Sequence, residues 1–430
     1  MKNAAPTPDA AHQAASLGGA GGSGAAQRRP LRVAFVSPVF LFPADAGGKI
    51  RTGNILRGLK ESGRFDVTLL SPASAEQQRE WQSELGRQCD RFVGWAPSAP
   101  RPRWRRAPDL LSSLPVNVAA DRTPAAVEAV KKLLAAGRFD VVVFDFVHAA
   151  VLRPANLKGA TVCFTHNVEA EIFERHAKTA ASAPLRWLWA SQAAKMRRYE
   201  REALTRFTRV VAVSERDVKK FAADGLTTAR AIPTGVDLDF FSWQAPADGS
   251  PTVVFTGSMD WEANVDGIRF YIDEVWPRVR AKQPNAQLRV VGKNPPTALT
   301  QRNLPGVTFT GFVDDVRNHV RDAQAFVIPL RVGGGTRIKA FEAMALGLPV
   351  VSTTIGIEGL DVDDGTHFLR ADGAEALAGA TLRLIADAAL RLKLSRAARE
   401  LVEARFGHRV AADAFGRILE EAVGAAEAAA

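Results

Sequence analysis

The segment from Gly333 to Glu342 combines residue types that bind phosphate groups and sugar hydroxyls. Its glycines let backbone N–H groups approach an anion closely, and the dipole of the helix predicted to follow favours negative charge. Arg337 and Lys339 are placed to neutralise a diphosphate, and Glu342, about one and a half turns into that helix, to accept hydrogen bonds from ribose hydroxyls. The alternative is a tight strand–helix turn with a solvated basic pair. The ligand contacts expected from this segment are Gly334, Gly335, Thr336, Arg337, Lys339 and Glu342.

A second glycine loop, Asp45-Ala46-Gly47-Gly48, follows the first predicted strand, and Arg51 lies three residues further on. Two-glycine turns are common, so a simple turn is the alternative. Open α/β sheets bind ligands outside the carboxyl ends of their strands, and this loop follows such an end. We therefore expect Gly47, Gly48 and Arg51 to contact the same ligand.

Two histidines follow predicted strands in the N-terminal half of the chain. His148 comes shortly after Asp145, and His166 follows the strand-like run 161–164 with Glu169 close behind. A lone histidine is more often structural or on the surface. Because both positions end a strand, we expect at least one to act in catalysis, with His166 preferred and His148 second.

Metal use is not expected, because no cysteine or histidine cluster is present. Asp237-Leu238-Asp239 and Asp361-Val362-Asp363 match an Asp-x-Asp pattern, which can hold a divalent cation beside a diphosphate. That pattern is too short to be specific. We expect no metal and no cofactor.

Apolar strand-like runs alternate with helix-length segments on both sides of a stretch, 243–250, that contains Pro, Gly and Ser. Near-continuous apolar strands with helices between them favour parallel sheets that are covered on both faces. The predicted strands are 31–37, 66–70, 141–144, 161–164, 209–213, 251–257, 287–291, 307–309, 325–329, 349–352 and 367–369. The predicted organisation is a disordered Ala/Gly-rich tail at 1–29, an α/β domain at 30–242, and a second α/β domain at 251–408.

The bulk composition is that of a globular protein with more than one domain. The chain has 430 residues, of which 47% are hydrophobic and 24% charged, with no apolar run long enough to span a bilayer. Two cysteines give no disulfide framework, and no signal-peptide pattern opens the chain, so we expect a cytoplasmic protein. A net charge of +10 suits a protein that meets phosphates or an anionic membrane.

Two stretches combine basic and aromatic residues. Residues 101–106 hold four arginines and a tryptophan, and 186–189 reads Arg-Trp-Leu-Trp at the start of a predicted helix that runs towards Leu204. A solvated loop is the default for the first and core packing for the second, and peripheral contact with a membrane is the alternative for both. Neither stretch belongs to a recognised nucleic-acid-binding module, so no nucleic-acid partner is expected.

The sequence from Phe341 to Val351 resembles the signature of the retaining GT-B glycosyltransferases of family 4 (glycosyl transferases group 1). The resemblance extends over most of residues 31–425, through pieces that stand in the order of that family. These pieces are Val211–Glu215, Ile232–Asp237, Phe255–Met259 and Gly311–Val316.

This resemblance implies a GT-B fold, in which two Rossmann-like domains face each other across a cleft and a final helix, 409–430, crosses back to the first domain. It implies that Glu342 binds the donor ribose, that the glycine loop meets the sugar and phosphates, and that Gly257 belongs to the donor site. The Gly47-Gly48 pair would close over the donor phosphates, and a histidine would lie near the transferred sugar.

The chain departs from the family at two places. The family commonly carries a second glutamate eight positions before Glu342, where this chain has Gly334. The usual basic pair after the first strand of the second domain is replaced by Met259-Asp260-Trp261-Glu262, so Arg337 and Lys339 are expected to take over the phosphate role. These features resemble a sub-branch with a Gly-Gly-Gly-Thr-Arg donor loop.

The function implied by the resemblance is transfer of a hexose, with retention, from a nucleotide-diphosphate sugar to a hydroxyl acceptor. The acceptor would be a glycan or a lipid-linked sugar, and the setting exopolysaccharide or cell-envelope synthesis in the cytoplasm or at the inner face of the membrane. Two alternatives are a sugar-nucleotide epimerase of the same shape and a nucleotide-sugar-binding scaffold that has lost catalysis.

Overall fold

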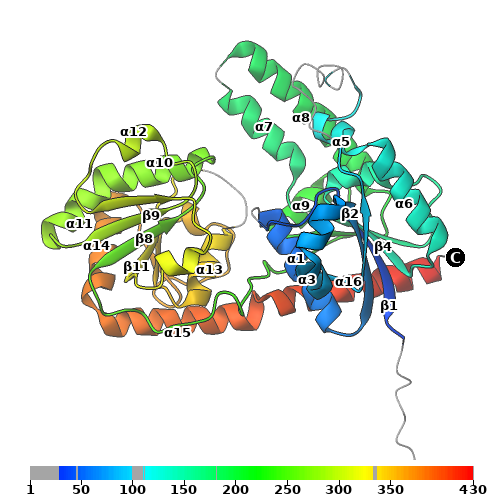
Figure 1. Cartoon of the computed structure of the whole chain (residues 1–430). Helices are drawn as coiled ribbons and strands as arrows, with labels where there is room; N and C mark the ends of the chain where they lie inside the picture. The colour runs from blue at the N-terminus through cyan, green and yellow to red at the C-terminus, as the bar shows by residue number, and fades with distance from the viewer. Residues whose placement is uncertain are drawn as a thin grey trace, which may run out of the picture.

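The computed structural model describes residues 29–44, 47–98, 110, 112–180, 182–332 and 337–429. The expectations for residues 1–28, for the arginine-rich stretch 101–106 and for Gly334, Gly335 and Thr336 lie outside these ranges. Each of the two lobes is built around one parallel sheet, with helices packed on both of its faces (Figure 1). The expected pair of α/β domains is confirmed, and we call the lobes the N-domain and the C-domain.

The N-domain sheet has seven strands in the order β3-β2-β1-β4-β5-β6-β7, and all of the pairs are parallel. Its central strands are buried on both faces, which accounts for their continuous apolar sequences. The strands are β1 (Leu31–Val36), β2 (Phe65–Pro72), β3 (Arg91–Trp95), β4 (Val141–Asp145), β5 (Ala160–Phe164), β6 (Arg209–Ala212) and β7 (Ala229–Ala231). The five predicted strands of this half are confirmed, and the edge strands β3 and β7 were not predicted.

The C-domain sheet has six parallel strands in the order β10-β9-β8-β11-β12-β13. The strands are β8 (Thr252–Thr256), β9 (Gln287–Val291), β10 (Val307–Gly311), β11 (Ala325–Ile328), β12 (Val350–Ser352) and β13 (Leu369–Arg370). The strand order reverses between β8 and β11, so the ends of these two strands frame the crevice where such sheets bind ligands. All six strands predicted for this half are present.

Helices cover both sheets. In the N-domain these are α1 (Gly47–Glu61), α2 (Ala75–Glu80), α3 (Gln82–Gln88), α5 (Val116–Asp121), α6 (Pro124–Ala136), α7 (Glu169–Thr179), α8 (Ala183–Leu204) and α9 (Glu215–Ala223). In the C-domain they are α10 (Glu262–Phe270), α11 (Trp276–Lys282), α12 (Thr297–Thr300), α13 (Ile338–Leu346), α14 (Ala374–Ala386) and α15 (Ala388–Arg405). None of the helices within the described ranges is both long enough and apolar enough to cross a membrane.

The last helix, α16 (His408–Ala428), crosses back and packs on the N-domain (Figure 1). Phe415 lies against Phe35 and Phe164, with ring centroids 6.4 and 5.0 Å apart. The close packing of α16 on α1 requires glycine at position 58, because a Cβ there would lie 2.3 Å from the Cβ of Ala412. The expected return of the final helix to the first domain is therefore confirmed.

The chain passes between the lobes twice, and the two passages are hydrogen-bonded to each other. The Val236 N–H donates to the Phe406 carbonyl, and the His408 N–H donates to the Val236 carbonyl, both at 2.7 Å. Val236 and Phe241 already belong to the C-domain core. The passage therefore lies before the 243–250 stretch that composition suggested as the linker, because Pro, Gly and Ser mark a loop there and not the point of crossing.

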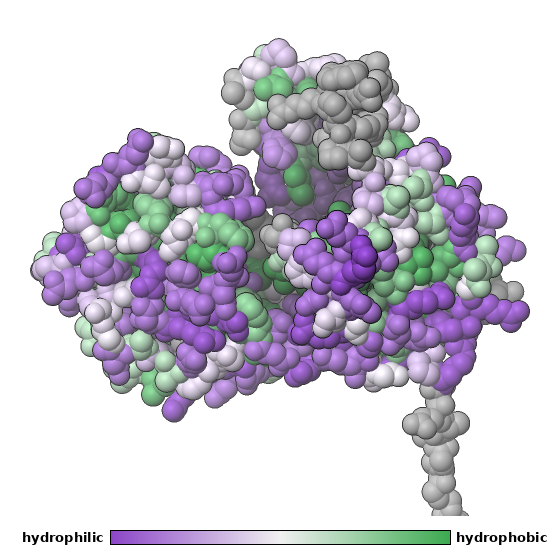
Figure 2. Space-filling view, in the orientation of Figure 1, coloured by the Kyte–Doolittle hydropathy of each residue, from purple (hydrophilic) through white to green (hydrophobic). Residues whose placement is uncertain are grey.

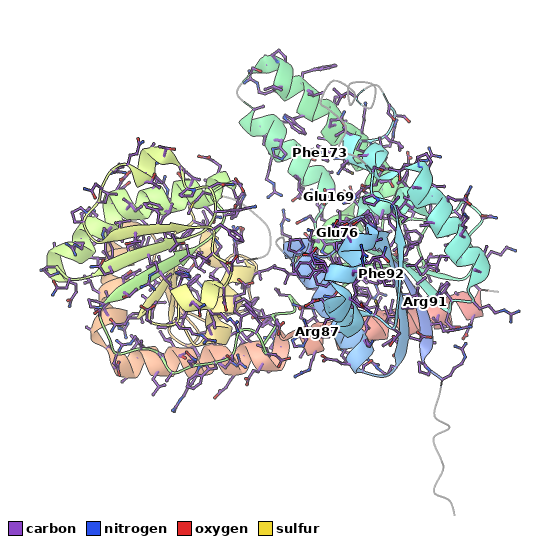
Figure 3. The ribbon with its side chains drawn as sticks, viewed as in Figure 1. Glu76, Arg87, Arg91, Phe92, Glu169 and Phe173 are labelled. Atoms are coloured by element: carbon purple, nitrogen blue, oxygen red, sulfur yellow. The ribbon has the colours of Figure 1, made fainter. Side chains whose placement is uncertain are left out.

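Helices α7 and α8 form a hairpin that projects from the N-domain (Figure 1). Figure 3 labels Glu169 near the base of α7 and Phe173 about one turn further out. Trp189 of α8 packs inside the hairpin, with its ring 5.9 Å from Phe173 and 4.9 Å from His176. The predicted packing is confirmed for Trp189, whereas Trp187 points outward and is 75% exposed.

Candidate functional site

The C-domain part of the site lies at the start of α13, next to the end of β8. Lys339 reaches from the first turn of α13 and donates to the Thr256 carbonyl and to Asn264 Oδ1, both at 2.8 Å. Its Nζ also lies 4.7 Å from the centre of the Phe255 ring. An ammonium group has three N–H donors, so these two hydrogen bonds fix the lysine and leave one donor for a ligand.

Glu342 lies one turn after Lys339 on the same helix and is half-buried. Burial raises the pKa of the Glu342 carboxyl to about 7, partly offset by the charge of Lys339. Burial also lowers the pKa of Lys339 to about 7, with a further lowering by Arg337 and an opposing effect of Glu342. Burial therefore disfavours the charged form of both groups, and a bound diphosphate would favour the protonated lysine.

Arg337 precedes α13 and is almost completely buried, with 3% of its surface exposed. Its guanidinium lies 5.6 Å from the centre of the Trp261 ring. Burial lowers the pKa of Arg337, the charge of Glu358 opposes this, and the positive charge of Arg175 on α7 adds to it. Arg337 is thus held on the C-domain within electrostatic reach of the N-domain hairpin. Trp261 stands where the family's basic pair was expected.

Gly257, directly after β8, gives Lys339 the room it needs. A Cβ at this position would lie 2.7 Å from Asn264 Nδ2 and 2.8 Å from Lys339 Nζ. Any side chain at position 257 would displace the lysine or the asparagine. The structure therefore places Gly257 beside Lys339, within the group of residues expected to hold the donor.

The N-domain part of the site is organised around Asp145, a fully buried carboxylate at the end of β4. It accepts hydrogen bonds from Ser37 Oγ at 3.0 Å, from Thr52 Oγ1 at 3.0 and 3.2 Å, and from His166 Nε2 at 2.8 Å. Sequence reasoning did not single out Asp145 as a site residue. The sequence did hold a signal for Asp145: it stands at the end of an all-apolar strand, where a buried charge must be paired.

His166 lies in the wall of the site with 2% of its side chain exposed. Because Nε2 donates to Asp145, Nδ1 carries the lone pair, and it lies 3.5 Å from Arg51 Nη1. Burial lowers the pKa of the His166 imidazole, partly offset by Asp145. The Phe146 ring stacks on the imidazole at 4.1 Å. His166 is thus a neutral, oriented histidine that Phe146 covers.

His148 lies on the other side of Phe146, in the 3-10 turn Val147–Leu152. Its Nδ1 is hydrogen-bonded to the Asp121 carboxylate, and its ring lies 5.0 Å from that of Phe146. Burial lowers the pKa of His148, but the hydrogen bond and charge of Asp121 outweigh it and the net shift is upward. Phe146 has a φ of +66°, a left-handed conformation that bulky residues rarely adopt and that is typical of functional loops.

The glycine pair at the start of α1 joins the two halves of the site. A Cβ on Gly48 would lie 2.8 Å from the Phe146 ring and 3.9 Å from His166 Nδ1. A Cβ on Gly47 would lie 3.8 Å from Ile338 Cδ1, the first residue of α13. The N-termini of α1 and α13 therefore lie close together across the two domains, and both favour an anion between them.

The hollow between the lobes is visible in Figure 2, beneath the α7–α8 hairpin. Charged groups of the two lobes act on one another across it. The pKa of Arg216 on α9 is raised by its hydrogen bond to Glu171 and, among other charges, by Glu358 of the C-domain. Burial lowers the pKa of Arg51 to about 10, with Asp217 and Asp145 opposing it. Cations from both domains thus surround the place where the helix N-termini meet.

The predicted site residues fall into two groups on either side of this hollow. Gly47, Gly48, Arg51 and His166 lie together on the N-domain, with His148 behind Phe146. Gly257, Arg337, Lys339 and Glu342 lie together on the C-domain.

The Asp-x-Asp pair at 237 and 239 lies elsewhere, at the passage between the lobes. Its carboxylates and the His408 ring are near enough to one another to share an ion. The Arg57 guanidinium already lies among them, 3.0 Å from Asp237 Oδ1 and 2.9 Å from His408 Nε2. A cation would have to displace this arginine, and the expectation of a metal-free site stays a prediction.

Residues 46–240 match the protein family described as Glycosyltransferase Family 4, and residues 250–387 match the family described as Glycosyl transferases group 1. Over 208 residues the chain is 30% identical to a phosphatidyl-myo-inositol mannosyltransferase of Mycobacterium tuberculosis. That alignment covers 45% of this chain and 54% of the relative, so the chain spans about half the length of the curated relatives it matches.

Among solved structures, a sucrose-phosphate synthase from Thermosynechococcus elongatus is similar, with a TM-score of 0.67 at 20% identity over 92% of this chain and all of that chain. The Anabaena protein HepE, in complex with UDP and glucose, has a TM-score of 0.62 at 15% identity over 91% of this chain and all of that chain. At these identities the likeness shows the fold, which is the GT-B arrangement expected from the sequence.

Proposed function

We propose that this chain, with a Family 4 domain in its N-terminal half and a Glycosyl transferases group 1 domain in its C-terminal half, is a glycosyltransferase. It would transfer a hexose from a nucleotide-diphosphate sugar to a hydroxyl acceptor with retention of configuration. In that step the bond from the anomeric carbon to the diphosphate breaks and the diphosphate leaves with the electron pair. The acceptor oxygen then bonds to the anomeric carbon, and its proton passes to an oxygen of the departing diphosphate.

The observation that carries the proposal is the group at the start of α13. Arg337 and Lys339 supply positive charge where the dipoles of α1 and α13 converge, and Lys339 is held in place by two hydrogen bonds. Such preorganised charge stabilises a departing diphosphate and is usually the largest contribution to the rate. Glu342, on the same face of α13 one turn on, would accept hydrogen bonds from the donor ribose. The solved complex of HepE with UDP and glucose supports a nucleotide-diphosphate donor.

The N-domain would supply the acceptor side and the groups near the transferred sugar. His166, oriented by Asp145, is the first candidate for a polar contact there, and His148 the second. Phe146 lies between them and covers His166, so we propose that its ring moves when a sugar enters. The acceptor would be a glycan or a lipid-linked sugar. The mannosyltransferase relative, named for phosphatidyl-myo-inositol, supports the lipid-linked class.

The proposed setting is exopolysaccharide or cell-envelope synthesis at the cytoplasmic face of a membrane. No metal or cofactor is proposed beyond the donor itself. The substitution of the family's second glutamate by Gly334 leaves the sugar-binding contact to backbone amides or to another residue.

Purified protein would be incubated with a panel of nucleotide-diphosphate sugars, and its thermal unfolding followed for each. A donor that binds only the folded state raises Tm, and we expect one nucleotide class to do so. The stabilising donor would then be incubated with glycan and lipid-linked acceptors, and the anomeric configuration of the product determined by NMR. Donor binding without transfer or donor hydrolysis would support the scaffold alternative, and conversion of the donor sugar into its epimer the epimerase alternative.

A further inference from the structure

The outer end of the α7–α8 hairpin exposes apolar side chains that the described part of the chain leaves largely uncovered. Residues 182–187, which open α8, are all exposed. Trp187 is 75% and Leu185 46% exposed. Trp189, two residues on, is turned the other way and packs against Phe173. The hairpin therefore encloses one tryptophan and presents the other outward, although both stand in the same short sequence.

Positive charge surrounds this apolar tip. Arg175 and Lys178, near the end of α7, are exposed, and so is Arg186 between Leu185 and Trp187. From Ile172 to Arg198 the only acidic residue is Glu174, and it is paired with Arg197. The basic residues of that stretch are Arg175, Lys178, Arg186, Lys195, Arg197 and Arg198.

The hairpin is held in place at its middle and at its base. Near its middle, Lys195 Nζ donates to the carbonyls of Leu110 and Ser112, both at 2.7 Å. At its base, the Glu200 carboxylate accepts from the Glu169 N–H at 3.0 Å and so caps α7. Because these contacts order the helices beforehand, docking of the tip costs little conformational entropy.

We propose that the tip of this hairpin docks on an anionic lipid bilayer, with Trp187 and Leu185 at the boundary between headgroups and acyl chains. Tryptophan prefers this boundary, and arginine and lysine beside it can bury their stems while their charges meet lipid phosphates. A protein partner fits less well, because a stable interface buries roughly 800 Å² on each side and two side chains offer only a small part of that area. Figure 1 shows the hairpin extending beyond both sheets, so it would meet a flat surface first.

The inference stands on the exposed tip and its charge, and it does not depend on the proposed transferase activity. Docking at this tip is compatible with the proposed transferase activity, because the hairpin rises beside the hollow between the lobes (Figure 2). An acceptor held in the same bilayer would then enter from the hairpin side.

The test is flotation of the full chain with vesicles of phosphatidylcholine, with and without phosphatidylglycerol. We expect binding to the anionic vesicles that falls as salt is added, because screening weakens the attraction of the tip's cations to the headgroups. The double variant Leu185→Ala/Trp187→Ala should bind them about tenfold more weakly or worse. Phe312→Ala is the matched control, because Phe312 is an aromatic residue 70% exposed on the C-domain. Its vesicle binding should equal that of the unaltered chain.

Two results would overturn the proposal: no flotation of the unaltered chain with anionic vesicles, or equal flotation of the chain and the double variant. Thermal stabilisation by UDP is measured on the same samples and should be retained in the double variant, which shows that the fold is intact. Failure of UDP and of every other nucleotide to stabilise any sample, with vesicle binding preserved, would count against the transferase proposal alone.

Discussion

His166 donates its Nε2–H to Asp145 across 2.8 Å, and both side chains are almost completely buried. Asp145 therefore decides which nitrogen of the imidazole carries the proton, and leaves the lone pair on Nδ1 towards Arg51 and Gly48. Ser37 and Thr52 hold the carboxylate in turn. The orientation of one histidine thus rests on the residue that follows β1 and on residues of α1 and β4.

Substitution of Asp145 by Asn should slow transfer through His166. The amide of asparagine is nearly the same size as the Asp145 carboxylate but carries no charge, so it no longer dictates the tautomer of His166. We therefore expect kcat to fall on the order of a hundredfold, with a small change in the KM for donor. The ¹⁵N chemical shifts of His166 should move away from those of an imidazole protonated at Nε2. Ser37→Ala is the control, since it removes one hydrogen bond to Asp145 and keeps the histidine contact. A normal tautomer in Asp145→Asn would refute the positioning role.

Arg337→Ala should weaken binding of the nucleoside diphosphate. Loss of a hydrogen bond to a charged group costs about 1.5–3 kcal/mol, and calorimetry measures this directly. Arg331→Ala is a matched control, because Arg331 lies six residues earlier, is exposed and is paired with Asp266. Unchanged affinity in Arg337→Ala would remove Arg337 from the phosphate site.

Glu342→Gln should weaken nucleotide binding and yet stabilise the free protein above neutral pH. Folding raises the pKa of the Glu342 carboxyl from its unfolded value to about 7, so ionisation of this carboxyl reduces the stability of the folded protein as pH rises between the two values. Glutamine does not ionise and causes no such loss. The variant's advantage in free energy of unfolding should grow between about pH 4.5 and 7 and then level off, on the order of 1–2 kcal/mol for a half-buried group. Denaturant unfolding at several pH values measures it. An advantage that does not change with pH would contradict the buried carboxyl.

Gly257→Ala should displace Lys339 and reduce both stability and nucleotide affinity. The added methyl would lie within 2.8 Å of Lys339 Nζ, and such overpacking costs about 1–3 kcal/mol. Gly249→Ala is the control, because nothing lies within 4 Å of a Cβ at position 249. Equal Tm values and equal nucleotide affinities for the two variants would mean that position 257 tolerates a side chain.

The sequence was sufficient for the parallel sheets because their central strands are buried on both faces, and apolar runs such as 141–144 and 251–257 reflect that burial. The edge strands β3 and β7 escaped prediction. β3 opens with the exposed Arg91 and is only partly buried, and β7 has three residues, so neither has a continuous apolar pattern.

The candidate site was predictable only in part. Arg337, Lys339 and Glu342 are close in sequence, and the helix that follows a glycine loop places them together. Asp145 and His166 are 21 residues apart and meet only because β4 and β5 are neighbours in the sheet. Composition alone could not show which of Trp187 and Trp189 packs inside the hairpin and which is exposed. Residues two apart on a helix face nearly opposite directions, so packing of one tryptophan turns the other outward.

The paired passages at Val236 and at Phe406–His408 constrain how the two lobes can move relative to each other. Both covalent connections between the lobes cross at one hydrogen-bonded point, and the close contact of Gly58 with Ala412 fixes α16 to the N-domain beyond it. The lobes can therefore swing about this common pivot, whereas sliding or pulling apart would break the paired backbone. A small swing would change the separation of Gly47 and Ile338 directly, so the fit of the site to the proposed diphosphate would depend on how far the lobes close.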